Sequence, residues 1–195
     1  ELGYQSVAIT LDHHRVNPFG PHLQTEITET QRLLAHYQLR SVLETGARFL
    51  LNPRVKHEPT LVSPHEEDRA VRIDFLKRAI DIAADLGSDA LSFWSGKLIV
   101  PTDPQTTWDR LLDGCREVAV HAKVRGVKLA FEPEPGMFVE TMDQFAELIR
   151  RLDDSSFGLT LDIGHLHCVE QGPITEYLKR WRDLIFNVHL EDMRR

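Results

Sequence analysis

The stretch that decides the fold is Phe157-Gly-Leu-Thr-Leu-Asp162-Ile-Gly-His165, where a short apolar run ends on an acid and an imidazole. Two other runs share this form, Val127-Lys-Leu-Ala-Phe-Glu132 and Leu184-Ile-Phe-Asn-Val-His189. Each run is typical of a buried parallel strand, and helix-like segments separate the three. Because the strands of a parallel barrel all point their carboxyl ends to one face, we expect Glu132, Asp162 and His189 to converge there.

Strand and helix signals alternate along the whole sequence, which favours a parallel sheet covered by helices. Candidate ligands at the ends of several separate strands favour a barrel over a doubly wound sheet, whose ligand lies in one crevice. We therefore expect residues 1–195 to form a single α/β domain, a TIM (β/α)8-type barrel that is incomplete, with about six βα units. No G-x-G-x-x-G or P-loop pattern occurs, which removes the commonest nucleotide-binding folds.

The composition is that of an ordinary globular protein, with 195 residues, 42% hydrophobic and 27% charged, and a formal net charge of −7. The acidic balance argues against a nucleic-acid partner, because such proteins present a basic face. The sequence shows no signal peptide and no apolar stretch of the roughly 20 residues that a membrane span needs. We therefore expect no membrane partner and a cytoplasmic location. Cys115 and Cys168 are interpreted as thiols.

Three helix starts carry capping signals. Ser63, followed by proline and by Glu66, predicts a capping box at the start of a helix. Thr106 is expected to cap the next helix, and Thr141 with Gln144 forms a second capping box.

The motifs Phe131-Glu132-Pro133, Leu161-Asp162-Ile163-Gly164-His165 and Val188-His189-Leu190-Glu191-Asp192 follow in order at three strand ends. With them the chain resembles the xylose-isomerase-like TIM barrels, the sugar phosphate isomerase/epimerase superfamily, over nearly its whole length. The resemblance implies that Glu132, Asp162 and His189 bind one divalent metal ion. Carboxylate and imidazole ligands suit Mn²⁺, Co²⁺ or Zn²⁺, with Mg²⁺ as a further candidate.

The resemblance also implies contacts to a substrate. Glu132 would be both ligand and catalytic base, and His165 would be a catalytic, substrate-contacting residue. Arg195 stands where the sugar 3-epimerase branch has a substrate-binding arginine. Trp94 and Glu134 follow strand ends, so both are candidates for substrate binding, although Trp94 could equally pack in the core.

These residues suit an enzyme that moves a proton at a carbon next to a carbonyl group. The expected function is a metal-dependent isomerase or epimerase that acts on a sugar, sugar phosphate or related polyol through an enediolate. A lyase or dehydratase acting on a polyol such as inosose is also compatible. The expected partner is a small sugar-like molecule.

The family has eight strands, whereas we count six, and the glutamate of its last strand would fall beyond Arg195. The strands Gln5–Leu11 and Ile185–His189 are therefore expected to be open apolar edges. Such edges favour pairing with another chain, so we expect a homo-oligomer, most simply a dimer.

Two other functions stay open. An endonuclease-IV-like zinc phosphodiesterase needs further histidines on earlier strands, but these end in Glu44-Thr45-Gly46 and Trp94-Ser95-Gly96. A non-catalytic, barrel-derived binding module is the other. Taken one at a time, Glu132 and Asp162 could also serve only to accept hydrogen bonds from loop amides or helix N-termini, but three such strand ends together favour a metal site.

Overall fold

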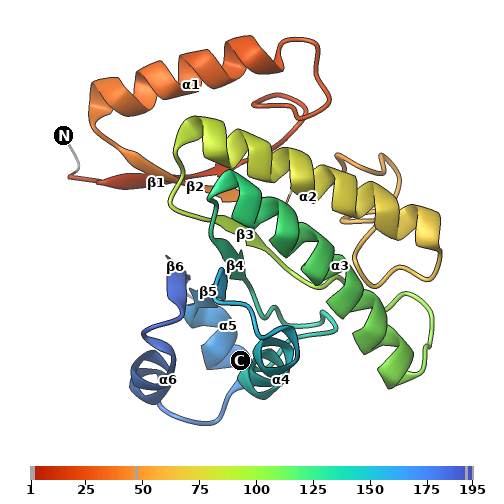
Figure 1. The fold of residues 1–195 in the computed structure, drawn as a ribbon. Coiled ribbons are helices and arrows are strands. Elements are labelled where there is room, and N and C mark those ends of the chain that lie inside the picture. Colours follow the sequence, from red (N-terminus) through yellow and green to blue (C-terminus); the bar gives the residue numbers. More distant parts are fainter. Residues whose placement is uncertain (1–2, 47, 192, 195) are drawn as a thin grey trace.

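A computed structural model describes residues 3–46, 48–191 and 193–194. Its sheet has six parallel strands, hydrogen-bonded in chain order (Figure 1): β1 Ser6–Thr10, β2 Arg40–Glu44, β3 Leu91–Phe93, β4 Leu129–Phe131, β5 Phe157–Asp162 and β6 Ile185–His189. The helices between them are α1 Leu23–Tyr37, α2 Glu66–Leu86, α3 Pro104–Arg125, α4 Met142–Leu152, α5 Ile163–Val169 and α6 Ile174–Trp181. The predicted α/β fold is confirmed.

The sheet curls into a half-barrel with helices on its outer side (Figure 1). In the part of the chain that the structure describes, β1 pairs only with β2 and β6 only with β5, so the predicted open edges are confirmed. Val7 on β1 is 39% exposed and Val188 on β6 is 50% exposed. No helix among the described residues has the length and apolarity that crossing a bilayer requires.

Alternation along the strands separates a helix-facing side of the sheet from a concave side. Leu43, Leu129 and Phe131 belong to the large core shared with the helices. Val42, Ala90 and Ala130 form a small second cluster. On the concave side, Thr160 Oγ1 donates a hydrogen bond to Ser92 Oγ at 2.9 Å, past the intervening β4. Side chains two positions apart on a strand lie on the same side of the sheet. The strand-end residues Glu44, Glu132, Asp162 and His189 therefore also lie on the concave side.

Aromatic rings support the strand ends from the helix-facing side. Phe93 meets Phe131 edge to face at a centroid distance of 5.4 Å and Phe157 at 5.6 Å. Phe145 of α4 stacks on Phe131 at 6.4 Å. These three phenylalanines of the sheet are fully buried, so β3, β4 and β5 rest on one packed layer that fixes where their ends lie.

The helix starts follow the predicted caps only in part. The capping box of Thr141 and Gln144 at α4 is confirmed. The box predicted for Ser63 is wrong, because α2 begins at Glu66 after His65, which makes no side-chain capping bond. The Ser63 hydroxyl instead donates to Glu58 Oε2 at 3.1 Å and accepts from a loop amide, so it is used in the preceding turn.

The cap predicted for α3 is also wrong. Asp103 caps this helix, and its Oδ2 accepts a hydrogen bond from the backbone N–H of Thr106 at 2.9 Å. Pro104 occupies the first helical position, where a missing N–H costs nothing. The Asp-Pro pair therefore starts the helix earlier than Thr106 could.

Candidate active site

A pocket of about 350 Å³ lies at the carboxyl ends of the strands. All the predicted site residues that the structure describes line it: Trp94, Glu132, Glu134, Asp162, His165 and His189. The substrate contact predicted for Arg195 lies outside the described residues. The pocket thus joins residues that are far apart in the sequence, although their roles stay predictions.

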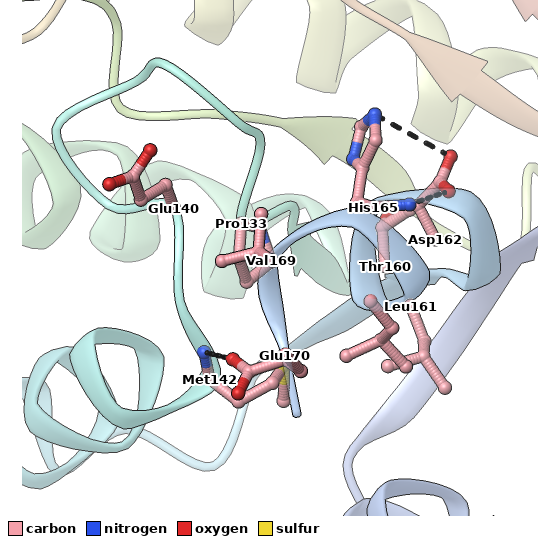
Figure 2. Close-up of a pocket in the computed structure, with 10 residues that line it drawn as sticks. Pro133, Glu140, Met142, Thr160, Leu161, Asp162, His165, Val169 and Glu170 are labelled. Carbon is pink, nitrogen blue, oxygen red and sulfur yellow. Dashed lines mark hydrogen bonds and ion pairs between the residues drawn. The ribbon is translucent and has the colours of Figure 1, made fainter. Parts of the chain in front are cut away.

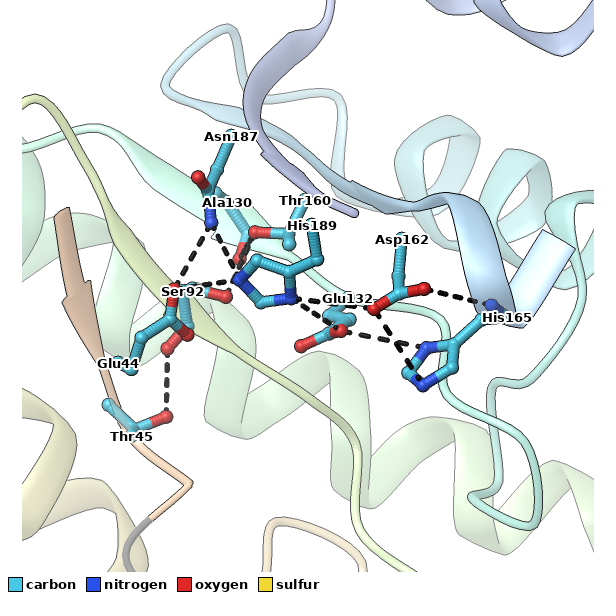
Figure 3. A network of polar contacts seen from close by, with 10 residues as sticks. All are labelled: Glu44, Thr45, Ser92, Ala130, Glu132, Thr160, Asp162, His165, Asn187 and His189. Carbon is cyan, nitrogen blue, oxygen red and sulfur yellow. Dashed lines mark hydrogen bonds and ion pairs between the residues drawn. The ribbon is translucent and has the colours of Figure 1, made fainter. Parts of the chain in front are cut away.

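Four of these residues form what we call the central cluster: Glu132, Asp162, His165 and His189 (Figure 3). Nδ1 of His189 lies 3.1 Å from Glu132 Oε1 and 3.7 Å from Asp162 Oδ2. The ring of His165 approaches the same carboxylates, with Nδ1 at 3.6 Å from Glu132 Oε1 and Nε2 at 3.9 Å from Asp162 Oδ2. Two carboxylates therefore face two imidazoles.

Asp162 uses its two carboxylate oxygens differently. Oδ1 caps α5 by accepting a hydrogen bond from the backbone N–H of His165 at 2.8 Å (Figure 2). Oδ2 is buried without a hydrogen-bond partner among the described residues and faces the central cluster. The helix-capping role that we held open for Asp162 thus accounts for one oxygen and leaves the other free to bind a ligand.

Helix α5, which the sequence did not predict, carries His165. Its far end is anchored by Glu170, whose Oε1 accepts from the backbone N–H of Met142 at 2.8 Å, at the start of α4 (Figure 2). Oε2 of Glu170 also accepts from the hydroxyl of Tyr177 at 2.9 Å. With Asp162 at one end and Glu170 at the other, this short helix holds His165 against the cluster.

The donor set of the cluster fits a divalent cation. Possible ligand atoms of Glu132, Asp162 and His165 all lie within 4.8 Å of one another. Asp162 Oδ2 and His165 Nδ1 are buried without a hydrogen bond, and an unmet buried polar atom costs about 1–3 kcal/mol. A cation would meet Asp162 Oδ2, and a substrate oxygen beside it would meet His165. Mixed carboxylate and imidazole ligands suit Mn²⁺, Co²⁺ or Zn²⁺.

The charges of the pocket shift two pKa values strongly. Hydrogen bonds to Glu132 and then to Glu44 raise the pKa of His189 to about 10, against the opposing effect of burial. Burial, followed by the nearby charge of Glu132, raises the pKa of Glu134 to about 7. Excess negative charge is therefore the main electrostatic feature of the pocket floor, as expected of a cation site.

Trp94 is both a core residue and a pocket residue. It is only 4% exposed, yet it lines the pocket. The guanidinium of Arg72 lies 4.4 Å from its ring centroid, and the ring of His57 meets it edge-on at 5.2 Å. Core packing is therefore observed for Trp94, whereas its contact with a substrate stays a prediction.

Sequence reasoning placed no functional residue in the loop between β2 and α2 and interpreted His57 as a surface residue, but this loop brings positive charge to the pocket. Arg48, Lys56 and His57 line it, and the His57 backbone N–H donates to Arg48 O at 2.6 Å, which closes the loop. Burial, then the charges of Lys56, Arg72 and Arg48, lowers the pKa of His57 to about 4. No sequence periodicity marks such a loop.

Glu44 is a further pocket residue without a predicted role. Glu44 is the last residue of β2, in a position like that of Asp162 at the end of β5 and of Glu132 just after β4. Its side chain lies on the concave face. Its Oε1 lies 2.9 Å from His189 Nε2. The signal was present in the sequence, because Glu44 is an acid at the end of an apolar strand, the same pattern that singled out Asp162.

Comparisons with known proteins agree with this fold. An inosose dehydratase from Clostridium beijerinckii is 32% identical over 87 residues, 45% of this chain and 29% of that protein. A D-allulose 3-epimerase from Methylomonas sp. has a TM-score of 0.79 at 18% identity, covering 97% of this chain and 63% of that chain. The IolI protein, solved with a bound zinc atom, has a TM-score of 0.68 at 18% identity, covering 95% of this chain and 63% of that chain.

The structural likenesses at this identity establish the fold alone. The chain also spans less than half the length of the inosose dehydratases that it matches. The sequence model of one family, however, matches residues 1–195. Six parallel strands in a curled sheet, with polar residues at their carboxyl ends, agree with that match. The chain belongs to the xylose isomerase-like TIM barrel family.

Proposed function

We propose that this protein is a metal-dependent enzyme that transfers a proton at a carbon next to a carbonyl group of a sugar-like polyol. Isomerisation, epimerisation and dehydration of such a substrate all begin with this step. The observation that carries the proposal is the central cluster, where Asp162 Oδ2 and His165 Nδ1 are buried without hydrogen bonds and face further ligand atoms. Relatives named as inosose dehydratase and sugar epimerase support the substrate class.

Glu132, Asp162 and His189 would hold the cation. When bound, the cation would stabilise the negative charge that develops on neighbouring substrate oxygens. Glu132 is 7% exposed and lies at the pocket floor, so its carboxylate can also take the proton from the substrate carbon. His165, held by α5, would donate a hydrogen bond to a substrate oxygen.

The remaining pocket residues would shape the substrate site. Glu134 would accept hydrogen bonds from substrate hydroxyls, and Trp94, which also lines the pocket, would contribute an apolar contact. The β2–α2 loop lines the pocket with Arg48, Lys56 and His57, whose positive charge can meet oxygen atoms of a substrate.

The first test is metal binding by the purified protein, measured by isothermal titration with Mn²⁺, Co²⁺, Mg²⁺ and Zn²⁺. We expect one ion per chain, and Asp162→Asn should weaken the binding, because the amide offers a poorer ligand than the carboxylate. The metal-loaded protein would then be assayed with neutral and phosphorylated ketoses and with inososes. Binding of none of the four ions by the wild type would refute the proposal, whereas three ions per chain would favour the nuclease alternative.

A further inference from the structure

Glu44 reaches the central cluster from the opposite side of the half-barrel. It ends β2, three strands from β5 and four from β6, and its side chain is only 14% exposed. Its Oε1 lies 2.9 Å from Nε2 of His189 and accepts a hydrogen bond from Asn187 Nδ2 at 3.1 Å (Figure 3). Because β2 and β6 do not pair within the described sheet, this contact exists only through the curl of the sheet.

The contact requires a hydrogen on Nε2 of His189. Nδ1, which lies 3.1 Å from Glu132 Oε1, carries one too, and a cation bound there would replace it. An ionised carboxylate can only accept hydrogen bonds, so Nε2 of His189 must carry the hydrogen that points to Glu44. The amide nitrogen of Asn187 lies 3.1 Å from the same Nε2, as expected of two donors that share one acceptor oxygen. Glu44 therefore keeps a hydrogen on Nε2 and fixes the rotation of the imidazole ring.

The other ring nitrogen faces the candidate ligands. Nδ1 lies 3.1 Å from Glu132 Oε1 and 3.7 Å from Asp162 Oδ2, whereas Nε2 points away from both toward β2 (Figure 3). A cation held by the two carboxylates would therefore meet His189 at Nδ1. Metal-binding histidines commonly donate their second N–H to a carboxylate, which fixes the ring and makes it a better ligand.

We propose that Glu44 is a positioning residue for the metal site: it holds Nε2–H of His189 so that Nδ1 is the nitrogen that binds the cation. This inference rests on the metal site of the proposed function and adds a residue and a ligand atom to it. Removing such a partner commonly weakens metal binding about 10- to 100-fold. Glu44→Ala should therefore show a loss in that range, and Glu44→Gln, which keeps an acceptor oxygen, a smaller one.

The chain contains a matched control. His121 Nε2 lies 2.9 Å from Asp81 Oδ1, a carboxylate–imidazole pair of the same length between α2 and α3. Neither residue lines the pocket at the strand ends. Asp81→Ala removes this contact, together with an ion pair between Asp81 and Arg125 at 2.9 Å, away from the cluster, so it should leave metal affinity unchanged.

The experiment measures Zn²⁺ affinity by competition with a chromophoric chelator for the wild type, Glu44→Ala, Glu44→Gln and Asp81→Ala. In parallel, ¹⁵N NMR of the Zn²⁺-loaded wild type reports which nitrogen of His189 binds the metal. Circular dichroism checks that each variant is folded; should Glu44→Ala fail this check, Glu44→Gln and the NMR spectrum decide.

We expect the Zn²⁺ affinity of Glu44→Ala to be the lowest of the four proteins and that of Asp81→Ala to equal the wild type. The NMR spectrum should show the metal on Nδ1 of His189 and the hydrogen on Nε2. Zn²⁺ bound through Nε2 overturns the inference, as does affinity of folded Glu44→Ala within twofold of the wild type. A wild type that binds no Zn²⁺, Mn²⁺, Co²⁺ or Mg²⁺ refutes the proposed function itself, and the inference with it.

Discussion

Nδ1 of His189 lies 3.1 Å from Oε1 of Glu132, although 57 positions separate the two residues in the chain. The residues lie at the ends of β6 and β4, and β5 runs between these strands. Neighbouring strands are about 4.8 Å apart, so a flat sheet would hold the two backbones roughly 10 Å from each other. Curvature of the sheet, with both side chains on its concave face, closes that gap.

Glu132→Gln should abolish turnover of the proposed enzyme while leaving the fold intact. The amide keeps the shape of the side chain but cannot take a proton, and general-base catalysis is worth at least about 100-fold. Melting temperature and turnover with the metal-loaded protein are the measurements. Activity within a few-fold of the wild type would show that Glu132 is not the base.

His165→Ala should impair substrate binding more than metal content. The ring approaches Glu132 and Asp162 only at 3.6 and 3.9 Å, and the proposed ligands Glu132, Asp162 and His189 would remain. Metal content by mass spectrometry and KM by kinetics separate the two roles. A loss of bound metal as large as that caused by Asp162→Asn would make His165 a ligand instead.

Gly96→Ala should destabilise the protein by about 2–4 kcal/mol, because it combines strain with a clash. Gly96 has φ +97°, and an added Cβ would lie 2.2 Å from Thr60 Cβ in the β2–α2 loop. The control is Gly87→Ala, at φ +64° with no atom within 4 Å, where about 1 kcal/mol of backbone strain is expected. Urea unfolding measures both; equal losses would show that the contact with Thr60 does not constrain the loop.

His57 should make the protein less stable in mild acid. Its folded pKa is about 4, whereas the ordinary value is 6.5, so between these values the unfolded chain binds more protons than the folded one. The free energy of unfolding contributed by neutral His57 is therefore complete above pH 6.5 and is lost as pH falls toward 4. Compared with the wild type, His57→Asn should gain relative stability on going from pH 8 to pH 5 in urea unfolding. An unchanged difference at the two pH values would contradict this.

The open edges of the sheet should make this 195-residue chain associate with itself. Val7 and Val188 are exposed on strands that have one paired neighbour each within the described sheet. Val7→Lys places a charge on β1, and charged edges resist strand pairing. Sedimentation velocity should show a smaller associated fraction for this variant than for the wild type. Val120→Lys, on the exposed face of α3, is the control, since 66% of Val120 is already in contact with water.

The sequence by itself determined the order of the six strands and of the helices other than α5, because apolar runs and helix stops depend on neighbouring residues. It also determined that Glu132, Asp162 and His189 meet at one face, since parallel strands all end on the same side. The start of α3 was predicted too late, because Asp103 capped it before Thr106 could. These features follow from local sequence patterns or from the rule that parallel strands all end on the same side of the sheet.

Only the tertiary structure decided what surrounds those residues. Glu44 meets His189 because the sheet curls, and Arg48, Lys56 and His57 reach the pocket because their loop folds back on itself. Contacts of this kind depend on the curvature of the sheet and on loop closure, which no periodic pattern encodes. The tertiary structure also decided the different roles of the two oxygens of Asp162. Oδ1 caps α5, whereas Oδ2 has no hydrogen-bond partner among the described residues and is left for a ligand.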